Sequence, residues 1–420
     1  MTRTDLRFTS VSALEILDSR GNPTVQVTVV ADDGRPYKAG VPSGASTGSR
    51  EAVELRDGDP ARYDGKGVTH AVANVEGEIA ELLQHRTWSS QAELDDELIE
   101  LDGTPNKARL GANAILGVSM AAARAFAQDE PLWQTLVPEG VAPHLPVPHF
   151  NVLNGGVHAA NDLDFQEFML APLGAPSFSE ALRAGATIYH RLRGELSSRG
   201  ESTGLGDEGG FAPDISSPEE VLALMVSAIE DAGYTAGREG VAIAMDPASS
   251  EFHRDGSYHV AGESLTSDQL IDRYEAIIDR FPVWSIEDGL AEDDWDGWKT
   301  LTQRLGGRIQ LVGDDIFVTN PTIISHAINE GIGNSALIKL NQIGTVTETL
   351  RAQAVCRRAG YTQMVSHRSG ETTDTFIADL AVATGAGQIK SGAPARGERV
   401  AKYDRLLEIE HAERALPFGL

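Results

Sequence analysis

The chain has 420 residues, and its 41% hydrophobic and 23% charged residues are an ordinary composition for a globular protein. Its length exceeds what a single hydrophobic core usually holds, so we expect two domains. The formal net charge of −27 argues against nucleic acid or an anionic membrane surface as a partner, because binding to either depends on clusters of Lys and Arg.

The cysteine content and the hydropathy pattern indicate a cytoplasmic protein. Cys356 is the only cysteine, so an intramolecular disulfide is excluded, as is typical of proteins in reducing compartments. Residues 1–16 contain no apolar signal-peptide core. The longest apolar stretch, residues 111–127, is interrupted by three polar residues and is predicted to be a buried helix, not a membrane span.

The first third of the chain is predicted to form a small α+β domain. Residues 24–30 alternate like a β-strand and follow a turn at 18–23, so two or three antiparallel strands are expected. Helical patterns come next, at residues 67–84, 90–101 and 108–129. Several prolines between positions 131 and 148 then interrupt regular structure. We therefore place one domain at residues 1–135 and a second at 145–420.

Residues 42–48, with the sequence PSGASTG, form a loop of small residues with three hydroxyl groups. The simpler interpretation is a flexible connection between strands. The functional interpretation is a mobile lid whose backbone or Ser46 hydroxyl reaches a bound ion. The residues alone favour the simpler interpretation.

The segment from 147 to 233 holds a glycine-rich loop among regular elements. We expect strands at 147–153 and 165–171, and helices at 177–199 and 217–233. Gly204 to Gly209 formally matches the G-x-G-x-x-G dinucleotide pattern, but that pattern needs a strand before it and a helix directly after it. Here a polar segment precedes the loop and Pro213 follows it. The loop instead offers two adjacent carboxylates, Asp207 and Glu208, on a backbone that can approach a ligand closely.

Six apolar segments between residues 241 and 390 each end on a residue able to bind a metal, a proton or a phosphate. These residues are Asp246, Glu287, Asp314, Lys339, then His367 with Arg368 and Ser369, and finally Lys390. Most of the intervals hold a helical pattern, such as residues 267–281 or 345–359. A strand–helix unit repeated about every 30 residues is typical of a (β/α)8 barrel, which carries its chemistry at the carboxyl ends of the strands.

A single charged residue at a strand end can simply turn into solvent. Six in series, with acids first and bases last, favour a function, because the strands of a parallel sheet are otherwise apolar. Three carboxylates from successive strands suit a hard cation such as Mg²⁺. A lysine becomes a general base if nearby cations lower its pKa, and Arg368 can hold a phosphate with two hydrogen bonds. Together these groups suggest proton abstraction beside a carboxylate.

Eight long motifs resemble those of the enolase family over essentially the whole chain. They lie at residues 17–25, 41–48, 110–117, 151–156, 206–210, 285–288, 337–344 and 365–371. The resemblance implies a C-terminal (β/α)8-type barrel of the enolase kind and a smaller N-terminal α+β domain that caps it. It also implies a phosphopyruvate hydratase, a glycolytic lyase that reversibly dehydrates 2-phospho-D-glycerate to phosphoenolpyruvate with two Mg²⁺ per active site.

The resemblance further assigns roles to individual residues. The metal ligands would be Asp246, Glu287, Asp314 and, on the mobile loop 42–48, Ser46. The catalytic residues would be Lys339 as the base at C2, and Glu208, supported by Glu167, as the acid at the C3 hydroxyl. The substrate-binding residues would be His158, Arg368 and Ser369 at the phosphate and Lys390 at the carboxylate, with Gln166, Glu167, Glu287, Asp314 and His367 around them.

Two other functions stay open at this point. One is a specialised enolase-like paralogue, for instance in phosphonate biosynthesis, that passes the same intermediate to another acceptor. The other is a non-catalytic surface or binding protein on the same fold. The loop at 159–164 adds two acids but no Lys or Arg, so it would repel a second anionic acceptor, and this favours plain dehydration. The resemblance also implies a homodimer or an octamer of dimers in the cytoplasm, and allows for a secreted or cell-surface fraction.

Overall fold

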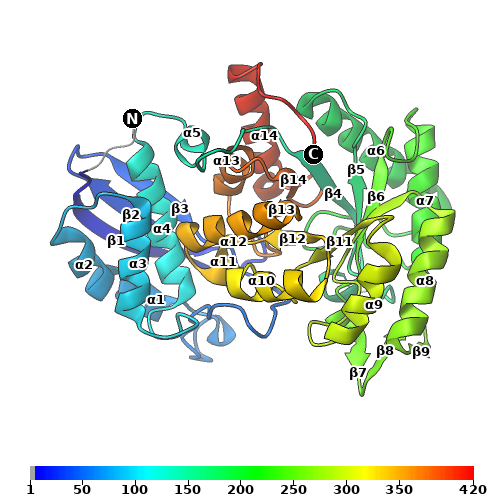
Figure 1. Cartoon of the computed structure of the whole chain (residues 1–420), viewed down its shortest axis with the longest axis horizontal. Helices are drawn as coiled ribbons and strands as arrows, with labels where there is room; N and C mark the ends of the chain where they lie inside the picture. The colour runs from blue at the N-terminus through cyan, green and yellow to red at the C-terminus, as the bar shows by residue number, and fades with distance from the viewer. Residues whose placement is uncertain (1–4, 160) are drawn as a thin grey trace.

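The structure is a computed structural model of the whole chain and describes residues 5–159 and 161–420. Residues 1–4 of the expected N-terminal domain, and Ala160 of the loop at 159–164, lie outside the described residues. Figure 1 shows a smaller N-terminal part on one side and a larger barrel, surrounded by helices, on the other.

The N-terminal part is built on a three-stranded antiparallel sheet, as expected. Its strands are β1 (Phe8–Leu17), β2 (Pro23–Ala31) and β3 (Pro36–Gly40). Val25, Val27 and Val29 of β2 are all buried on one face, because side chains two positions apart point the same way. This face packs on α4 (Ala112–Ala127). Gly117 permits the close approach, since a Cβ there would lie 2.5 Å from Cγ2 of Val27.

The helices of this part follow the sequence pattern with one difference. They are α1 (Thr69–Asn74), α2 (Ala80–Gln84), α3 (Gln91–Asp102), α4 and the short α5 (Leu132–Thr135). The helical pattern expected at 67–84 is confirmed for residues 69–84, but it contains an unexpected π-helical turn at Val75–Ile79, where Gly77 leaves helical backbone angles. The buried helix expected at 111–127 is α4, which is buried along nearly its whole length. Among the described residues, no helix is both long and apolar enough to cross a membrane.

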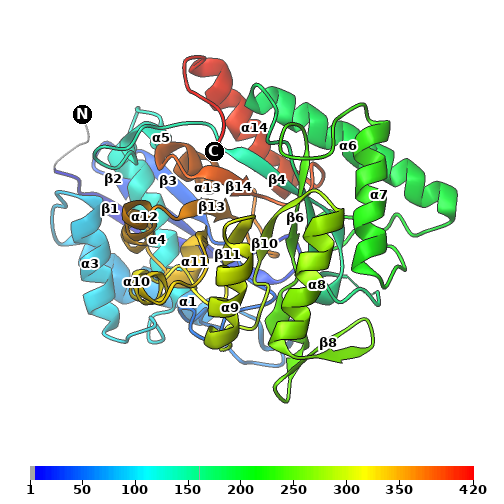
Figure 2. The same ribbon diagram turned by 45° about the vertical axis from the view of Figure 1, so that its right-hand side comes forward.

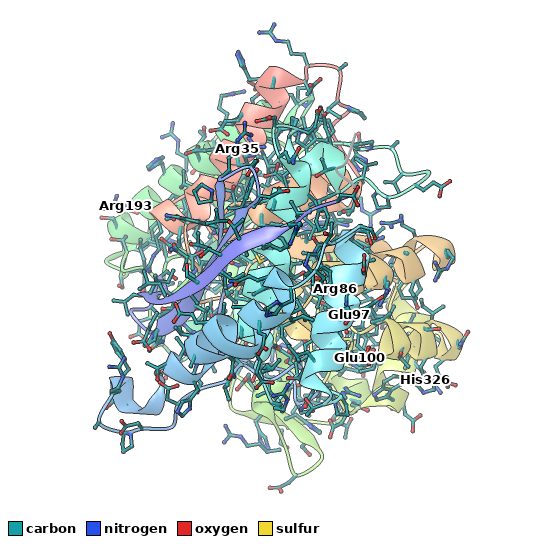
Figure 3. All side chains as sticks on the ribbon, turned by 90° about the vertical axis from the view of Figure 1, so that its left-hand side faces the viewer. Arg35, Arg86, Glu97, Glu100, Arg193 and His326 are labelled. Atoms are coloured by element: carbon teal, nitrogen blue, oxygen red, sulfur yellow. The ribbon has the colours of Figure 1, made fainter. Side chains whose placement is uncertain are left out.

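Charged side chains cover the outer face of the N-terminal part. Figure 3 shows Glu97 and Glu100 on α3, with Arg86 near Glu97. Arg86 pairs with Glu93 at 2.7 Å and with Glu97 at 3.0 Å. Exposed ion pairs add little to stability. These charged side chains therefore mainly keep the outer face in contact with solvent.

The larger part is a closed eight-stranded barrel. Its strands are β4 (Val147–Asn154), β5 (Glu167–Ala171), β6 (Ala242–Asp246), β10 (Val283–Glu287), β11 (Gln310–Gly313), β12 (Ser335–Ile338), β13 (Thr362–Ser366) and β14 (Gly387–Lys390). β5 runs antiparallel to both β4 and β6, and every other neighbouring pair is parallel. The repeated strand–helix unit expected from residue 241 onward therefore begins at β6, and the expected barrel is confirmed.

Helices surround the barrel on the outside (Figure 2). They are α6 (Phe178–Arg199), α7 (Pro218–Asp231), α8 (Ser267–Arg280), α9 (Trp295–Leu305), α10 (Pro321–Glu330), the short α11 (Leu340–Ile343), α12 (Val346–Ala359), α13 (Phe376–Ala383) and α14 (Gly397–Ala412). Several begin where a side chain caps a backbone N–H. The capping residues are Ser177, Ser217, Thr266, Asp294, Asn320 and Thr345. A small sheet of β7 (His253–Arg254), β8 (Ser257–Val260) and β9 (Glu263–Leu265) lies between β6 and α8 in the chain.

The acidic run at 292–294 has structural roles. Asp294 caps α9 and accepts hydrogen bonds from the hydroxyls of Tyr258 at 2.7 Å and Ser267 at 2.6 Å. Glu292 accepts the backbone N–H of Ser49 at 3.1 Å. The sequence could not reveal these partners, because they come from distant segments of the chain.

The N-terminal part covers the carboxyl ends of the barrel strands. Ser43 and Gly370 exchange two backbone hydrogen bonds, at 2.7 and 2.8 Å, just beyond the end of β13. Arg124 of α4 binds Asp374 through both guanidinium nitrogens, at 2.8 and 2.7 Å. These contacts hold the loop at 42–48 over the barrel mouth, where the charged residues gather.

Candidate active site

Lys390 lies at the centre of a cluster of buried carboxylates at the barrel mouth. Its Nζ is 3.0 Å from Asp246 Oδ2, 2.9 Å from Glu287 Oε1 and 3.0 Å from Glu167 Oε2. Each of the four residues is at or beside the end of its strand, and all are at least nine-tenths buried. The barrel therefore brings together three acids and one base that are far apart in the sequence.

This cluster carries more acid than base. Burial opposes the charge on Lys390, but Asp246, Glu167 and Glu287 together raise its pKa well above the usual range. Burial, followed by repulsion from Asp246, raises the pKa of Glu287 well above its usual range. One oxygen of Glu287, Oε2, is buried and has no hydrogen-bond partner in the part of the chain that the structure describes. An additional cation would stabilise such a group.

Lys339 and Asp314 form a second ion pair in the same mouth. The Lys339 Nζ contacts Asp314 Oδ2, and Gln342 donates to the other carboxylate oxygen at 2.8 Å. Burial disfavours both charges, yet Asp314 raises the pKa of Lys339, and Lys339 lowers the pKa of Asp314. Lys339 is therefore a protonated amine here. It can act as a base only after it has given up this proton, which is easier once Asp314 no longer stabilises the ammonium.

Glu167, Glu208 and His158 form a third group. His158 Nδ1 lies between the two carboxyls, 3.6 Å from Glu167 Oε1 and 3.8 Å from Glu208 Oε1. Burial and the charge of Glu208 raise the pKa of Glu167 well above its usual range. Burial also opposes ionisation of Glu208, but His367 and His158 hold its pKa well below the usual range. These opposite shifts favour a proton on Glu167 over one on Glu208.

Glycines bring the Glu208 loop against β4. A Cβ at Gly210 would lie 2.5 Å from Asn154 Oδ1 and 2.9 Å from the Leu153 backbone nitrogen. Asn151 of β4 then donates its Nδ2 to Glu208 Oε2 at 2.9 Å. As the sequence indicated, the loop is not followed by a helix, because α7 begins only at Pro218.

Arg368, the predicted phosphate ligand, is occupied by groups of the chain itself. Its two terminal nitrogens lie 2.8 and 3.1 Å from the carboxylate oxygens of Glu51. It also donates to Asn341 Oδ1 and to the Ser46 carbonyl, both at 3.0 Å. Burial opposes its charge, but Glu51 raises the pKa of Arg368. A carboxylate from the N-terminal part therefore occupies the position that a bidentate anion would take.

One cavity collects nearly all the predicted site residues. It is lined by Ser46, His158, Gln166, Glu167, Glu208, Asp246, Asp314, Lys339, His367, Arg368, Ser369 and Lys390. Glu287 is the one predicted site residue that is absent from this lining, and it joins the cavity through Lys390. Among the described residues, the Ser369 hydroxyl and the side-chain oxygen Oε1 of Gln166 are buried without hydrogen-bond partners, so both can bind a ligand.

The predicted metal ligands form two groups around the lysines. Asp246 and Glu287 meet at Lys390, whereas Asp314 lies with Lys339 and Gln342. Asp288, Asp314 and Asp315 also bring carboxylate oxygens close together. Buried carboxylates in excess of the ammonium groups are a donor set that fits a hard divalent cation.

Sequence reasoning missed several residues of the site. Asp288 accepts the backbone N–H groups of Asp314 and Asp315, at 2.9 and 2.8 Å. The acidic doublets at the end of β10 (residues 287–288) and directly after β11 (residues 314–315) were a usable signal for these residues. Glu51 and Asn341 gave no local signal, because their contact with Arg368 joins distant segments.

Comparisons with known proteins cover almost the whole chain. Residues 8–136 match the family model described as "Enolase, N-terminal domain", and residues 142–415 match the one described as "Enolase, C-terminal TIM barrel domain". A protein of Rubrobacter xylanophilus named Enolase is 58% identical over 407 residues, which are 96% of this chain and 94% of that protein. A protein of Acidothermus cellulolyticus, also named Enolase, is 59% identical over 404 residues, 96% of this chain and 93% of that protein.

Proposed function

Because the chain belongs to the enolase family, we infer that it is a phosphopyruvate hydratase. This lyase of glycolysis interconverts 2-phospho-D-glycerate and phosphoenolpyruvate, a small anionic substrate and product, and it uses a divalent metal. The observation that supports this reaction best is that one cavity is lined by a lysine at a strand end, Lys339, and by two carboxyls whose pKa values are shifted in opposite directions, Glu167 and Glu208.

We assign the two proton transfers to different groups. Lys339 first loses to solvent the proton that its pair with Asp314 stabilises. The neutral amine then removes the proton from C2, and the electrons of that bond form the C2–C3 double bond. The C3–oxygen bond breaks as Glu208 gives its proton to the departing hydroxyl, which leaves as water. Lys339 ends with one proton more and Glu208 with one fewer, so the step balances.

The acid proton has a source within the site. The raised pKa falls on Glu167, while Glu208 is the residue that we assign to the leaving group. His158 lies within 3.8 Å of both carboxyls, so the proton has a short path between them. This supports Glu167 as the reservoir that recharges Glu208.

We propose that the metal is Mg²⁺, with two ions per site. Asp246, Glu287 and Asp314 would hold one ion, and Ser46 would help to hold the other, since all offer the oxygen ligands that Mg²⁺ prefers. The metal would supply positive charge beside the substrate carboxylate and so make the C2 proton more acidic. The excess of buried carboxylate over ammonium in this mouth supports the assignment.

The remaining side chains bind and orient the substrate. His158, Arg368 and Ser369 would hold the phosphate, Lys390 the carboxylate, and Gln166 and His367 would line the pocket. The phosphate must take the place of Glu51 on Arg368, so release of Glu51 accompanies binding. The Ser369 hydroxyl supports this assignment, because it is buried beside Arg368 in the chain and has no hydrogen-bond partner within residues 5–159 and 161–420.

We further propose that residues 1–135 cap a catalytic barrel at 145–420, with a mobile loop at 42–48. The protein would be a cytoplasmic homodimer or octamer of dimers, without nucleic-acid or membrane partners. The single cysteine and the net charge of −27 support this environment. The paralogue that uses another acceptor is not favoured, because the loop at 159–164 contains no Lys or Arg.

The direct test is to incubate the pure protein with Mg²⁺ and 2-phospho-D-glycerate alone. Phosphoenolpyruvate should accumulate at an ordinary enzymatic rate, on the order of 1–10³ per second. Turnover that appears only after a phosphonate co-substrate is added would instead favour the paralogue. Binding of 2-phospho-D-glycerate without any turnover would indicate a non-catalytic protein.

A further inference from the structure

Arg399 of α14 is a buried cation at the edge of the active site. It has no exposed surface, and its guanidinium donates to the backbone carbonyls of Arg368 and Ser369. It also donates to the carbonyl of Asp207 at 3.2 Å, next to Glu208 in the chain. Arg399 therefore ties the end of β13 to the loop that carries Glu208.

The same guanidinium reaches a ring nitrogen of His367. Arg399 Nη1 lies 2.6 Å from His367 Nδ1. An arginine side chain can only donate hydrogen bonds, so Nδ1 must be the acceptor and carries no proton. The neutral ring then carries its proton on Nε2, which lies 3.1 Å from Glu208 Oε2. Nε2 and Oε2 are within reach but not yet aligned as a hydrogen bond in this structure.

The two oxygens of Glu208 are therefore in different environments. Oε2 accepts from Asn151 Nδ2 at 2.9 Å and faces the Nε2 proton of His367. Among the described residues Oε1 accepts no hydrogen bond, and the His158 ring, 3.8 Å away, is beside it. A proton on Glu208 must sit on the oxygen that does not already face donors, which is Oε1.

We propose that Arg399 is a positioning residue for the dehydration step: by fixing His367 as an Nε2–H donor, it directs the acid proton of Glu208 to Oε1. The inference rests on the proposed role of Glu208. A doubly protonated His367 would place an Nδ1–H against the guanidinium, so the arrangement also keeps the ring neutral. In agreement, burial, with a contribution from Arg399, lowers the pKa of His367 to about 3.

The first test reads the tautomer without any turnover. Protein labelled with ¹⁵N-histidine gives long-range ¹H–¹⁵N spectra that distinguish the two neutral tautomers and the imidazolium, and the His367→Gln spectrum identifies the signal among the 11 histidines. We expect His367 to be neutral, with the proton on Nε2. A proton on Nδ1, or on both nitrogens, in the wild-type protein would overturn the proposal.

Substitutions then link the tautomer to the chemistry. Arg399→Met removes the donors and should move His367 away from the pure Nε2–H form. It should lower kcat for dehydration by about 10²-fold, the low end of general-acid catalysis, while exchange of the C2 proton with solvent continues. Arg399→Lys keeps a cationic donor and should recover most of both effects.

Arg405→Met is the matched control, because Arg405 lies on the same helix but pairs with Asp379, at 3.0 and 2.7 Å, away from the cavity. It should change neither the His367 signal nor the ratio of exchange to dehydration. An unchanged tautomer in Arg399→Met, or an equal loss of exchange and dehydration, would overturn the proposal. If Arg399→Met does not fold, the wild-type and Arg399→Lys spectra still decide. Absence of dehydration by the wild-type protein would instead refute the proposed function and leave the tautomer measurement valid.

Discussion

The two ends of the barrel interior are both buried, but their polar groups are satisfied in different ways. Near the amino ends of the strands, Gln310 and Gln388 exchange hydrogen bonds at 2.9 and 2.8 Å, and Ser285 and Thr362 complete the network. At the carboxyl ends, lysines and carboxylates form ion pairs in which acids outnumber bases. Neutral groups that satisfy one another stabilise a fold, whereas an unbalanced set of charges is complete only with a ligand.

The histidines follow the same division. Burial lowers the pKa of His149 to about 3, and this ring lies tilted against Trp284, with ring centroids 5.5 Å apart. Its Nε2 has no hydrogen-bond partner among the described residues. His158 has a similar degree of burial, but two carboxyls lie beside its ring. A buried ring next to apolar neighbours fills space, while one between two acids can pass a proton. Burial alone therefore does not identify function; the partners do.

Of the changes that test this contrast, removal of the metal should have the largest effect on activity, and it should affect only the carboxyl end of the barrel. Chelation should lower dehydration by at least about 10³-fold, because several kcal/mol of charge stabilisation is lost at the mouth. The amino-end network should be unaffected, so far-UV circular dichroism should stay unchanged. Activity is measured after dialysis against a chelator, and Mg²⁺ is added back as the control. Full turnover in metal-free protein would show that the carboxylates serve another purpose.

The variant Glu51→Gln tests whether a carboxylate of the N-terminal part competes with the substrate phosphate for Arg368. The neutral amide binds Arg368 more weakly than the carboxylate does, so Arg368 is more available to the substrate phosphate. KM for 2-phospho-D-glycerate should therefore fall about tenfold, which corresponds to roughly the free energy of one charged hydrogen bond. Glu54→Gln is the control, because Glu54 pairs with Arg56 and accepts from Ser43 instead. An unchanged or higher KM in Glu51→Gln would contradict the exchange of Glu51 for phosphate.

Gln388→Ala should affect stability and not activity. It removes both hydrogen bonds between Gln388 and the Gln310 amide, which keeps only Ser285 and Thr362 as partners, and this should lower the free energy of unfolding by about 1–3 kcal/mol. The double variant Gln310→Leu/Gln388→Leu removes both amides and should be closer to the wild type. Denaturant unfolding and kcat are measured on the same samples. A large loss of kcat in Gln388→Ala at unchanged stability would contradict the division between the two ends.

Much of this contrast could be predicted from the sequence, because it depends on the order of strands. Asp246, Glu287 and Lys390 each mark a strand end, and a closed barrel must bring such ends to one mouth. The antiparallel direction of β5 could not be predicted in this way, because the pattern of a short apolar strand does not indicate whether it runs parallel or antiparallel to its neighbours. The π-helical turn at Gly77 was also missed, because the apolar pattern continues through it.

Contacts between segments that are far apart in the chain could not be predicted from the sequence. Glu51 lies in an N-terminal loop and Arg368 lies after β13, and only the folded chain shows that they pair. Arg399 sits in an ordinary helical pattern without a motif of its own. The pattern named two acids, Glu167 and Glu208, but which one carries the proton depends on His367, His158 and Lys390 around them.

The central claim is that the mouth contains a separate base and acid, and one measurement tests it most directly. Exchange of the C2 proton with solvent and formation of phosphoenolpyruvate are followed together for Lys339→Ala and Glu208→Gln. Lys339→Ala should abolish both, since no base remains, whereas Glu208→Gln should slow dehydration by about 10²–10⁴-fold and keep exchange measurable. Undiminished exchange in Lys339→Ala, or equal loss of both steps in Glu208→Gln, would contradict the account.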